Sequence, residues 1–545
     1  MRSVFKSLLP AAAMSVVMAS GGIAQSVESG FTAMSDGDFA TAYRALRQAA
    51  AHGDARAGAL MGEIFGTGPY ARTPDATVEA PDAGAQTAPR VAPQQPAVLP
   101  AERGRLLAPL VIRRPPPRPF AVPSAPMALN DDMFAQIDMA LAEIGRDLFF
   151  DPILSGNKDV SCATCHHPTL GSGDGVSLGL GTGAAGLGPE RSVAGPYSAQ
   201  ERIPRNAPAL WNLGVSDLRV LFHDGRVERD PTDPATLLTP QGPLDYMALD
   251  SVLAAQALFP VLSHAEMAGR ATENRVATAV KEERIHGDDG AWALLSARID
   301  GIDDYRTSFS AWRGQDARVR MDEIANAIAA FISHEFRAND TAFDRYMREE
   351  AALSPEAGEG MRLFFGKARC AECHSGALLS DQEFHAMGEP PIGPGKERDA
   401  DGYTRDIGRA AVTLSRGDAY AFRTPMLRNV VHNGPWGHAG AFSDLRDFVT
   451  HHMDPVAGLE RYSPQAVLPQ LASALPDYGA LSNRMQVGAV KAAAARTMKR
   501  YGMPALAEGE MDMLMAFLDA LSDPASLDGR IGAPDSLPSG LPLAE

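Results

Sequence analysis

The sequence CATCH spans residues 162–166, and the sequence CAECH spans residues 370–374. Together they contain all four cysteines of the 545-residue chain. Two thiols at this spacing reach the two vinyl groups of one haem, and the next residue, His, is placed to bind the iron. Structural zinc needs four ligands, and a redox-active C-x-x-C pair needs no His. Two covalently attached c-type haems are therefore predicted, held by Cys162, Cys165, His166, Cys370, Cys373 and His374.

The stretches that precede the two motifs resemble each other. Leu-Phe-Phe occurs at residues 148–150 before the first motif and at residues 363–365 before the second. Two related haem domains in tandem are the simplest account, with bounds 128–350 and 351–525, followed by a tail over 526–545. We expect a mainly α fold of two cytochrome c-like domains with long loops.

Apolar spacing places helices in both domains. Residues 133–150 and 321–347 repeat apolar side chains at the helical period. Pro355 opens a helix that leads into the second motif, and a last helix is expected over 508–521. Alternation typical of long β-strands is scarce, which favours helices throughout.

The first 24 residues have the pattern of a secretory signal. Arg2 and Lys6 precede the apolar run 8–18, and Ala24 is the small residue before the expected cleavage point. That run is too short to span a bilayer, and no other stretch is long and apolar enough. We expect an exported, periplasmic protein without a transmembrane segment.

Two further segments separate this signal from the first haem domain. Residues 25–70 resemble one Sel1-like or tetratricopeptide-type helical hairpin, which is either a docking module or a small cap on the main body. Residues 71–127 contain 13 prolines, which is typical of an extended linker.

The formal net charge of −17 limits the partners. Nucleic-acid binding needs a basic patch for the phosphates, so this class of partner is excluded. The acidity is compatible with a basic electron-donor protein.

Six ordered stretches resemble the bacterial di-haem cytochrome c peroxidase family, which includes the MauG-type enzymes that mature tryptophylquinone cofactors. They are GRDLFFDPILSGNKDVSCATCHHP, RNAPALWN, FHDGR, AIAAFISHEFRANDTAFDRYM, GEGMRLFFGKARCAECHSG and FRTPMLRNVVHNGPWGHAG. The resemblance covers about residues 130–525 and leaves residues 1–127 out.

The resemblance implies roles for the haem pockets. His166 would be the proximal ligand of the peroxidatic haem, and His374 that of the electron-transfer haem. Gln256 and Glu266 fall in AQALFPVLSHAEMAG, which is similar to the family's distal segment. A distal carboxylate suits peroxide reduction, because one oxygen must lose a proton and the other must gain one. A glutamate on a solvated helix face is the alternative interpretation.

The second axial ligand of the electron-transfer haem is Met or Tyr in the family, at a fixed distance after the His of the GHAG-like motif. Counting from His438 reaches His452. The resemblance therefore implies ligation by His374 and His452, which lowers the potential relative to Met. His451 and Met453 are the alternatives, because a helix presents only one of three consecutive residues to the iron.

Two departures from the family pattern bear on function. Many members carry a His that caps the peroxidatic iron, but this sequence has no His between His167 and His223. An iron open without reductive activation is expected, as in the MauG type, with Tyr197 as the alternative ligand. The family's inter-haem Trp is His223 here, which is harder to oxidise but is expected to conduct by its position.

The family also binds one calcium ion between its domains. The matching positions are Asn206, through its side chain, and Asn433 and Pro435, through their carbonyl oxygens. Oxygen ligands of this kind suit calcium. Alternatively, Asn206 caps a turn.

The leading hypothesis is a periplasmic di-haem peroxidase that reduces hydrogen peroxide to water. Its electrons would come from a small periplasmic donor, a cytochrome c or a cupredoxin. A second hypothesis is a MauG-like oxidant that modifies residues of a partner protein, with the N-terminal repeat as a docking site. A third is a non-catalytic di-haem electron-transfer cytochrome.

Overall fold

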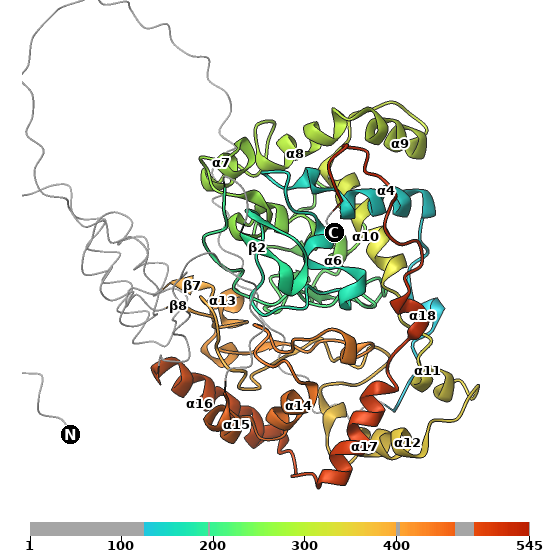
Figure 1. Cartoon of the computed structure of the whole chain (residues 1–545), viewed down its shortest axis with the longest axis vertical. Coiled ribbons are helices and arrows are strands. Elements are labelled where there is room, and N and C mark those ends of the chain that lie inside the picture. The colour runs from blue at the N-terminus through green and yellow to red at the C-terminus, as the bar shows by residue number, and fades with distance from the viewer. Residues whose placement is uncertain (1–124, 194–196, 399–403, 464–483, 544–545) are drawn as a thin grey trace, which may run out of the picture. The chain divides into compact units, whose positions relative to one another are not determined.

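The computed structural model of the chain describes residues 125–193, 197–398, 404–463 and 484–543. The expected signal, hairpin repeat and almost all of the proline-rich linker lie outside the described residues. The described part is mainly helical, as predicted, and its strands are only two or three residues long (Figure 1). Within that part, none of the helices combines the length and the hydropathy that a bilayer crossing requires.

The first half of the described chain contains the first C-x-x-C-H motif on a short helix. Its α-helices are α4 (Met139–Phe150), α5 (Cys162–Cys165), α6 (Val252–Ala257), α7 (Arg275–Lys281), α8 (Ala291–Asp300), α9 (Asp303–Arg313), α10 (Met321–Glu335) and α11 (Ala342–Met347). Short 3-10 or π turns are η1 (Asp131–Met133), η2 (Pro152–Leu154), η3 (Pro168–Leu170), η4 (Gly188–Glu190), η5 (Pro260–Leu262) and η6 (His264–Ala268). The strands are β1 (Ala184–Ala185), β2 (Ser192–Val193), β3 (Val220–Leu221), β4 (Val227–Arg229) and β5 (Leu237–Leu238).

The second half repeats this plan: among the described residues, each half has one α-helix before its motif and six after it. Its α-helices are α12 (Pro355–Phe365), α13 (Ala410–Thr413), α14 (Leu445–Met453), α15 (Pro455–Arg461), α16 (Arg484–Tyr501), α17 (Glu508–Asp519) and α18 (Pro524–Leu527). The 3-10 turns are η7 (Cys370–Glu372), η8 (Arg416–Asp418) and η9 (Val430–His432). The strands are β6 (Phe384–His385), β7 (Glu397–Arg398), β8 (Thr404–Arg405) and β9 (Phe422–Arg423).

One helix pair forms the centre of each half. In the first half α4 crosses α10, and Gly145 lies so close to the carbonyl oxygen of Ala327 that a Cβ would be 1.8 Å from it. In the second half α12 crosses α17, and Gly360 meets the carbonyl oxygen of Met513 in the same way, at 1.9 Å. Each glycine precedes its Leu-Phe-Phe by the same spacing, so the sequence repeat corresponds to a repeated helix crossing.

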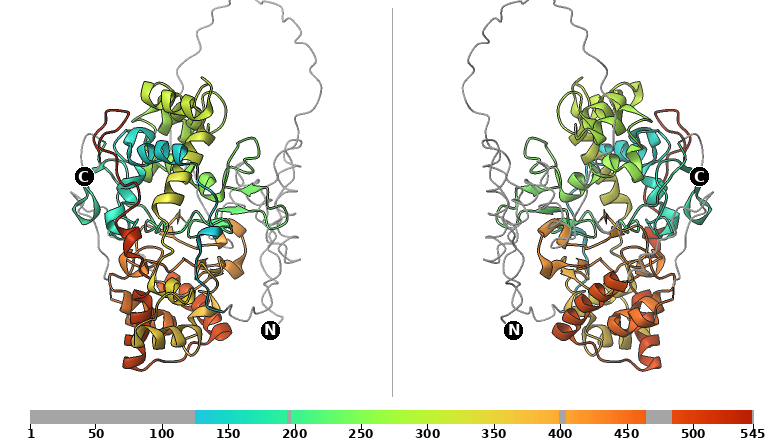
Figure 2. Two further views of the ribbon diagram at one scale, coloured as in Figure 1. Left: turned by 90° about the vertical axis from the view of Figure 1, so that its right-hand side faces the viewer. Right: turned by 90° about the vertical axis from the view of Figure 1, so that its left-hand side faces the viewer.

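Two apolar cores lie around these crossings. The first core runs through α4, α6, α8 and α10 and continues to Ala338, and the second core begins with Phe343 of α11. The change from one core to the other therefore falls before the boundary at residue 350 that the sequence suggested. Figure 2 shows the first half in cyan to yellow and the second half in dark yellow to red.

Helix boundaries differ from the expected ones where polar side chains bind the backbone. The helix expected over 133–150 begins at Met139, because the Asp138 carboxylate accepts the N–H of Leu141 at 3.2 Å. The helix expected over 321–347 is two helices. Asn212 bonds both backbone groups of Ala338, at 2.8 Å each, and so ends α10, and Thr341 then caps α11.

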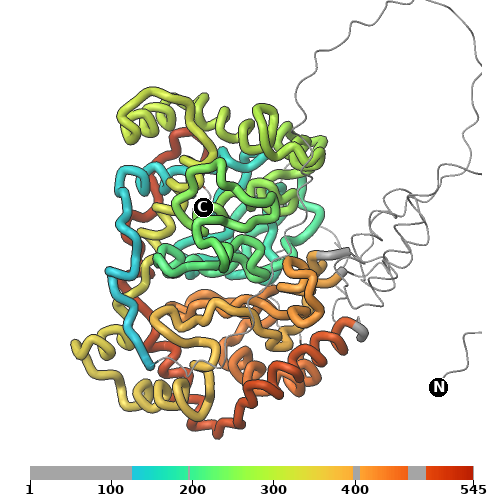
Figure 3. The backbone as a smooth tube through the Cα atoms, turned by 180° about the vertical axis from the view of Figure 1, so that it is seen from behind, coloured from blue at the N-terminus to red at the C-terminus, as the bar shows by residue number. Residues whose placement is uncertain are grey.

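The segment expected as a tail packs against the first half. Leu537 is buried in the first core, and the Ser539 hydroxyl donates to Asp151 at 2.7 Å. The Glu335 carboxylate accepts the N–H of Ile531 at 2.8 Å. Figures 1 and 3 show this C-terminal segment, in dark red, beside the cyan α4. Residues 528–543 therefore form a strap that returns to the first core.

Buried ion pairs join the two halves next to the motifs. Arg205 binds Asp406 through two hydrogen bonds of 2.6 and 2.8 Å, and Arg409 binds Glu228 through two of 2.8 Å. All four side chains are nearly inaccessible to solvent. Paired and forked contacts of this kind fix the register of the two surfaces.

Candidate functional site

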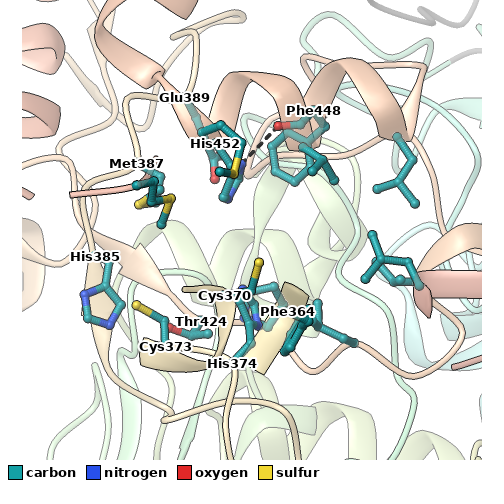
Figure 4. A pocket seen from close by; sticks show the side chains of 18 of the residues that line it. Phe364, Cys370, Cys373, His374, His385, Met387, Glu389, Thr424, Phe448 and His452 are labelled. Carbon is teal, nitrogen blue, oxygen red and sulfur yellow. Dashed lines mark hydrogen bonds between the residues drawn. The ribbon is translucent and has the colours of Figure 1, made fainter. Parts of the chain in front are cut away.

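A cavity of about 950 Å³ lies at the second C-x-x-C-H motif. Cys370, Cys373 and His374 form one wall of it, on and after η7 (Figure 4). Nδ1 of His374 lies 3.0 Å from the carbonyl oxygen of Leu379. Such a backbone bond fixes the tautomer and orientation of a metal-binding imidazole and leaves Nε2 as the ligand atom.

His452 lies on the opposite wall of this cavity. It comes from the last turn of α14, and Figure 4 shows it across from the motif, beside Glu389 and Phe448. Its Nδ1 lies 3.2 Å from the carbonyl oxygen of Phe448, one turn back along the helix. Burial lowers the pKa of His452 to about 4, so the imidazole is neutral, which is the form that binds metals.

The two alternative ligands lie differently. His451 is buried outside the cavity, and its Nε2 is bonded to the carbonyl oxygen of Gly388 at 2.9 Å. Successive helical residues point about 100° apart, which separates His451 from His452. Met453 does line the cavity, as do the thioethers of Met387 and Met503.

A second cavity, of about 1360 Å³, lies at the first motif. Cys162, Cys165 and His166 line it from α5 and its C-terminal end. Nδ1 of His166 lies 3.0 Å from the carbonyl oxygen of Ser172, as Nδ1 of His374 does from its own backbone partner. The two motifs therefore present equivalent imidazoles.

The thiols of both motifs fit covalent attachment to a porphyrin. All four cysteines are free, and burial raises the pKa of Cys162, Cys165 and Cys370 to about 12. Zinc is bound by thiolates, which this burial disfavours. Paired thiols next to an imidazole, at the edge of an apolar cavity, are the groups that a c-type haem requires.

Gln256 and Glu266 both line the first motif's cavity. Gln256 lies on α6, and Glu266 lies on η6, a single π-helical turn that Ser263 caps by accepting the Glu266 N–H at 3.3 Å. Single π turns occur frequently at functional sites. Burial raises the pKa of Glu266, while the positive charges of Arg226 and Lys396 oppose the rise.

Arg226 and Lys396 line the same cavity and share one counter-ion. Arg226 Nη1 lies 3.0 Å from Asp224 Oδ1, and Lys396 Nζ lies 3.2 Å from Asp224 Oδ2. Lys396 comes from the second half of the chain, so both halves build the surroundings of Glu266. Burial lowers the pKa of Lys396.

The first cavity offers few further groups that could bind a metal beside His166. In the part of the chain that the structure describes, the imidazoles that line this cavity are His166 and His223. Nε2 of His223 is already 3.1 Å from the carbonyl oxygen of Asn206. Tyr197, the alternative ligand, is 44 % exposed and does not line the cavity.

His223 lies between the two motifs. It lines the first cavity, and its carbonyl oxygen accepts the N–H of Arg423 at 2.8 Å. Arg423 lines both cavities. Burial, with the positive charges of Arg205 and His438, lowers the pKa of His223 to about 4, so this imidazole is neutral near pH 7.

The three expected calcium ligands lie around one junction of the halves. Asn206 donates from Nδ2 to the carbonyl oxygen of Pro435 at 2.7 Å, and its Oδ1 is buried without a partner among the described residues. Asn433 ends η9, two residues before Pro435. The Oδ1 and Nδ2 atoms of an Asn side chain are told apart only by their hydrogen bonds. If these two atoms of Asn206 were exchanged, Oδ1 would lie beside the carbonyl oxygen of Pro435. This is a donor set that a hard cation takes.

Several residues of the two cavities gave no sequence signal. Lys396 and Arg423 lie in the second half and reach the first cavity only through the fold. Asp174 follows the first motif closely, and burial raises its pKa to about 7. Charged side chains far apart in sequence have no spacing that would reveal their meeting.

Comparison with known proteins agrees with this arrangement. The family model for di-haem cytochrome c peroxidase matches residues 139–352. A cytochrome-c peroxidase of Pseudomonas sp. (strain SCT), IdrP2, is 27% identical over 331 residues, which cover 57% of this chain and 73% of that protein. The methylamine utilization protein MauG of Paracoccus denitrificans (strain Pd 1222) is 29% identical over 417 residues, which cover 73% and 92%. Residues 139–352 therefore belong to the di-haem cytochrome c peroxidase family.

A solved structure is also similar. It is that of a MauG-like protein associated with microbial copper homeostasis, with a TM-score of 0.46 and 23% sequence identity. The similarity covers 74% of this chain and 94% of that chain.

Proposed function

We propose that this member of the di-haem cytochrome c peroxidase family reduces hydrogen peroxide to water at the first cavity. Electrons from a small redox protein, a cytochrome c or a cupredoxin, would enter at the second cavity. The observation that carries the proposal is that Gln256 and Glu266 line the same cavity as Cys162, Cys165 and His166. A cavity built only for electron transfer has no need of a buried acid–base group.

Each cavity would hold one haem through its own residues. His166 and the first pair of thiols would hold one, and His374 with His452 would bind the other from both sides. The haem at the first cavity supplies the redox chemistry of O–O cleavage. The protein then sets ligation, access and the delivery of protons.

Glu266 would move the proton that peroxide must transfer. Reduction of one hydrogen peroxide to two waters takes two electrons and two protons, and one oxygen gives up its proton before it receives others. A carboxylate takes this proton and returns it to the leaving oxygen. The raised pKa of Glu266 makes it a better proton acceptor than an exposed glutamate. Gln256 adds an amide, both donor and acceptor, to the same cavity.

Electrons would cross from the second cavity to the first through the residues between them. His223 lines the first cavity, and Arg423, bonded to its carbonyl oxygen, lines both. A neutral, buried His223 is a poor site to lose an electron. It would therefore provide a bonded path and not a stable radical.

Calcium would be bound by Asn206, Asn433 and Pro435. Support comes from the buried Asn206 Oδ1, which has no partner among the described residues. A cation there would tie the segment before His223 to the segment before His438.

We place the protein in the periplasm, because the first 24 residues have the pattern of an export signal.

A second candidate function is the oxidation of residues on a partner protein, which the resemblance to the MauG-type enzymes implies. An iron at His166 that is open without reductive activation, as in the MauG type, would favour this function. His223 is bonded to the carbonyl oxygen of Asn206, and Tyr197 does not line the cavity, so neither is placed to cap that iron. His in place of the family's inter-haem Trp counts against it. The N-terminal repeat would be the docking site in this case, and it lies outside the described residues.

Electron counting under turnover separates these candidates. The protein is mixed with peroxide and a reduced small cytochrome c or cupredoxin, and the electrons consumed per peroxide are counted. Two electrons per peroxide at a rate faster than the donor's own reaction supports the peroxidase. The MauG-like function is supported if peroxide is consumed without oxidation of the donor, and if added oxygen atoms or cross-links are found on protein side chains. No consumption of peroxide leaves the non-catalytic cytochrome.

A further inference from the structure

Among the described residues, Arg423 is the one that lines both cavities. It lies on β9, which pairs with β6 through Phe384 opposite Arg423 and His385 opposite Phe422. Its side chain lines the cavity at each C-x-x-C-H motif. A single guanidinium therefore faces both candidate haem sites.

This guanidinium has no carboxylate partner among the described residues. Among the described residues, the only hydrogen bond from its side chain is a long one, 3.3 Å from Nη1 to the carbonyl oxygen of Thr424, and its Nε is buried without a partner there. Burial lowers the pKa of Arg423 to about 10, and no nearby anion raises it.

Three other buried arginines are paired with carboxylates. Arg205 binds Asp406 and Asp224, Arg409 binds Glu228, and Arg428 binds Asp344 in fully buried pairs. Burial of a cation without a counter-charge is unfavourable, so unpaired buried cations are rare in proteins. Arg423 is partly exposed and lines both cavities, so an anion bound in these cavities would neutralise it.

The groups that would bring anions into both cavities are the haems themselves. Each porphyrin carries two propionate carboxylates in addition to the vinyl groups that the thiols capture. A guanidinium offers two edges, each a pair of N–H donors that matches a carboxylate. A lysine at this place would supply one point charge and could not bind two carboxylates in this way.

We propose that Arg423 holds one propionate of the haem in each cavity and so couples the two redox centres electrostatically. The inference rests on the proposed function only in requiring a haem at both motifs. One positive charge shared by the two cavities then favours the reduced form of both haems, because reduction adds negative charge to each. The bond from the Arg423 N–H to the His223 carbonyl oxygen keeps this shared cation next to the inter-haem path.

Redox titration of the full haem-loaded protein tests the inference. Arg423→Gln is expected to weaken the reduction of both haems by at least tenfold, which is a fall of about 59 mV in each one-electron midpoint potential. The fall should grow with rising pH, because a propionate without its cation is neutralised by a proton at low pH and stays charged at high pH. Arg423→Lys keeps the charge and should restore most of both potentials.

Arg446→Gln serves as the matched control. Arg446 lies on α14 with His452, but it is more exposed and is paired with Asp512, so solvent screens its charge. Both potentials should stay at their wild-type values in this variant. A shift of one potential only in Arg423→Gln, or of neither, overturns the shared contact.

A second measurement covers the case in which Arg423→Gln loses haem. Resonance Raman spectra of Arg423→Lys report the propionate bending bands while the charge is kept. Because lysine lacks the paired N–H donors of the guanidinium, Arg423→Lys should shift a propionate band of both haems. A band that stays in place at either haem overturns the inference. Neither test uses peroxide, so a protein that ignores peroxide but shows both effects refutes the proposed function and leaves this inference standing.

Discussion

Glu266 has a buried carboxyl group whose pKa lies above the ordinary value. The carboxyl group therefore gains its proton at a higher pH than an exposed glutamate does. If the carboxylate accepts the proton of peroxide, the reaction slows as pH falls through this raised pKa. The acid limb of the pH–rate profile should therefore lie above 4.5, the ordinary value for glutamate.

Removal of a neighbouring positive charge tests this assignment by its sign. Lys396 opposes the rise in the Glu266 pKa, so Lys396→Gln should move the acid limb to higher pH. Lys281→Gln removes the same charge from the exposed end of α7 and should leave the limb in place. A limb that moves to lower pH in Lys396→Gln would show that another group accepts the proton.

Substitution of Glu266 itself tests its catalytic role. Glu266→Gln keeps the shape of the side chain but removes the base, and the rate of reaction with peroxide should fall by about 10²–10⁴. Rapid-mixing absorption spectroscopy measures this rate, and the haem content of the variant provides the control. An unchanged rate would return Glu266 to a structural role.

Ligation of the second haem depends on which imidazole α14 presents. His452→Met should convert the absorption and EPR spectra of that haem to a His/Met type and raise its midpoint potential. His451→Asn should leave the spectrum unchanged, because His451 bonds to Gly388 outside the cavity. If His451→Asn alters the spectrum and His452→Met does not, then α14 presents His451 and not His452 to the iron, and the proposed ligand is wrong.

The site was predictable where its residues are tied to a local motif. Spacing alone pointed to the two cysteines and the His of each motif, and the matched segments pointed to Gln256, Glu266 and His452. All nine residues line one of the two cavities. Lys396, Arg423 and Asp174 were not predicted, since their significance comes from burial and from contacts between distant segments. No periodicity or spacing in the sequence expresses such contacts.

At the scale of elements, the helix crossings were more predictable than the helix ends. Apolar periodicity located α4, α10, α12 and α17, because these helices bury one face in a core. The ends of α4 and α10 were misplaced, because Asp138 and Asn212 bind backbone groups there. The strap over residues 528–543 was expected as a tail, since its core-packing residues Ile531, Leu537, Leu541 and Leu543 follow no helical or strand period. Most of its hydrogen bonds are donated by backbone N–H groups to the carboxylates of Glu335 and Asp151, and these bonds leave no pattern in the sequence.

The strap should contribute measurably to the stability of the first half. Leu537 is 7 % exposed and packs in the first core, so Leu537→Ala should lower the free energy of unfolding by about 2–5 kcal/mol. Leu414 is 51 % exposed, and Leu414→Ala should change it by less than about 0.5 kcal/mol. Denaturant unfolding of the haem-loaded protein measures both, and equal effects would mean that the strap is not held in solution.

At the scale of the whole molecule, the two halves are joined where the expected calcium site lies. The purified protein should contain one equivalent of calcium, because Asn206 Oδ1 has no other partner among the described residues. Asn206→Ala should lose this calcium while keeping both haems, as elemental analysis and haem quantification will show. Full calcium content in Asn206→Ala would contradict the assigned ligand.

The central claim is an accessible peroxide-reducing haem at His166, and one measurement tests it most directly. The protein as isolated is titrated with hydrogen peroxide, before and after one-electron reduction, while absorption and EPR spectra are recorded. The account predicts one high-spin haem that reacts with peroxide as isolated, beside one low-spin haem, and a reaction slowed by Glu266→Gln. Two low-spin haems that ignore peroxide in both redox states would contradict it and leave an electron carrier.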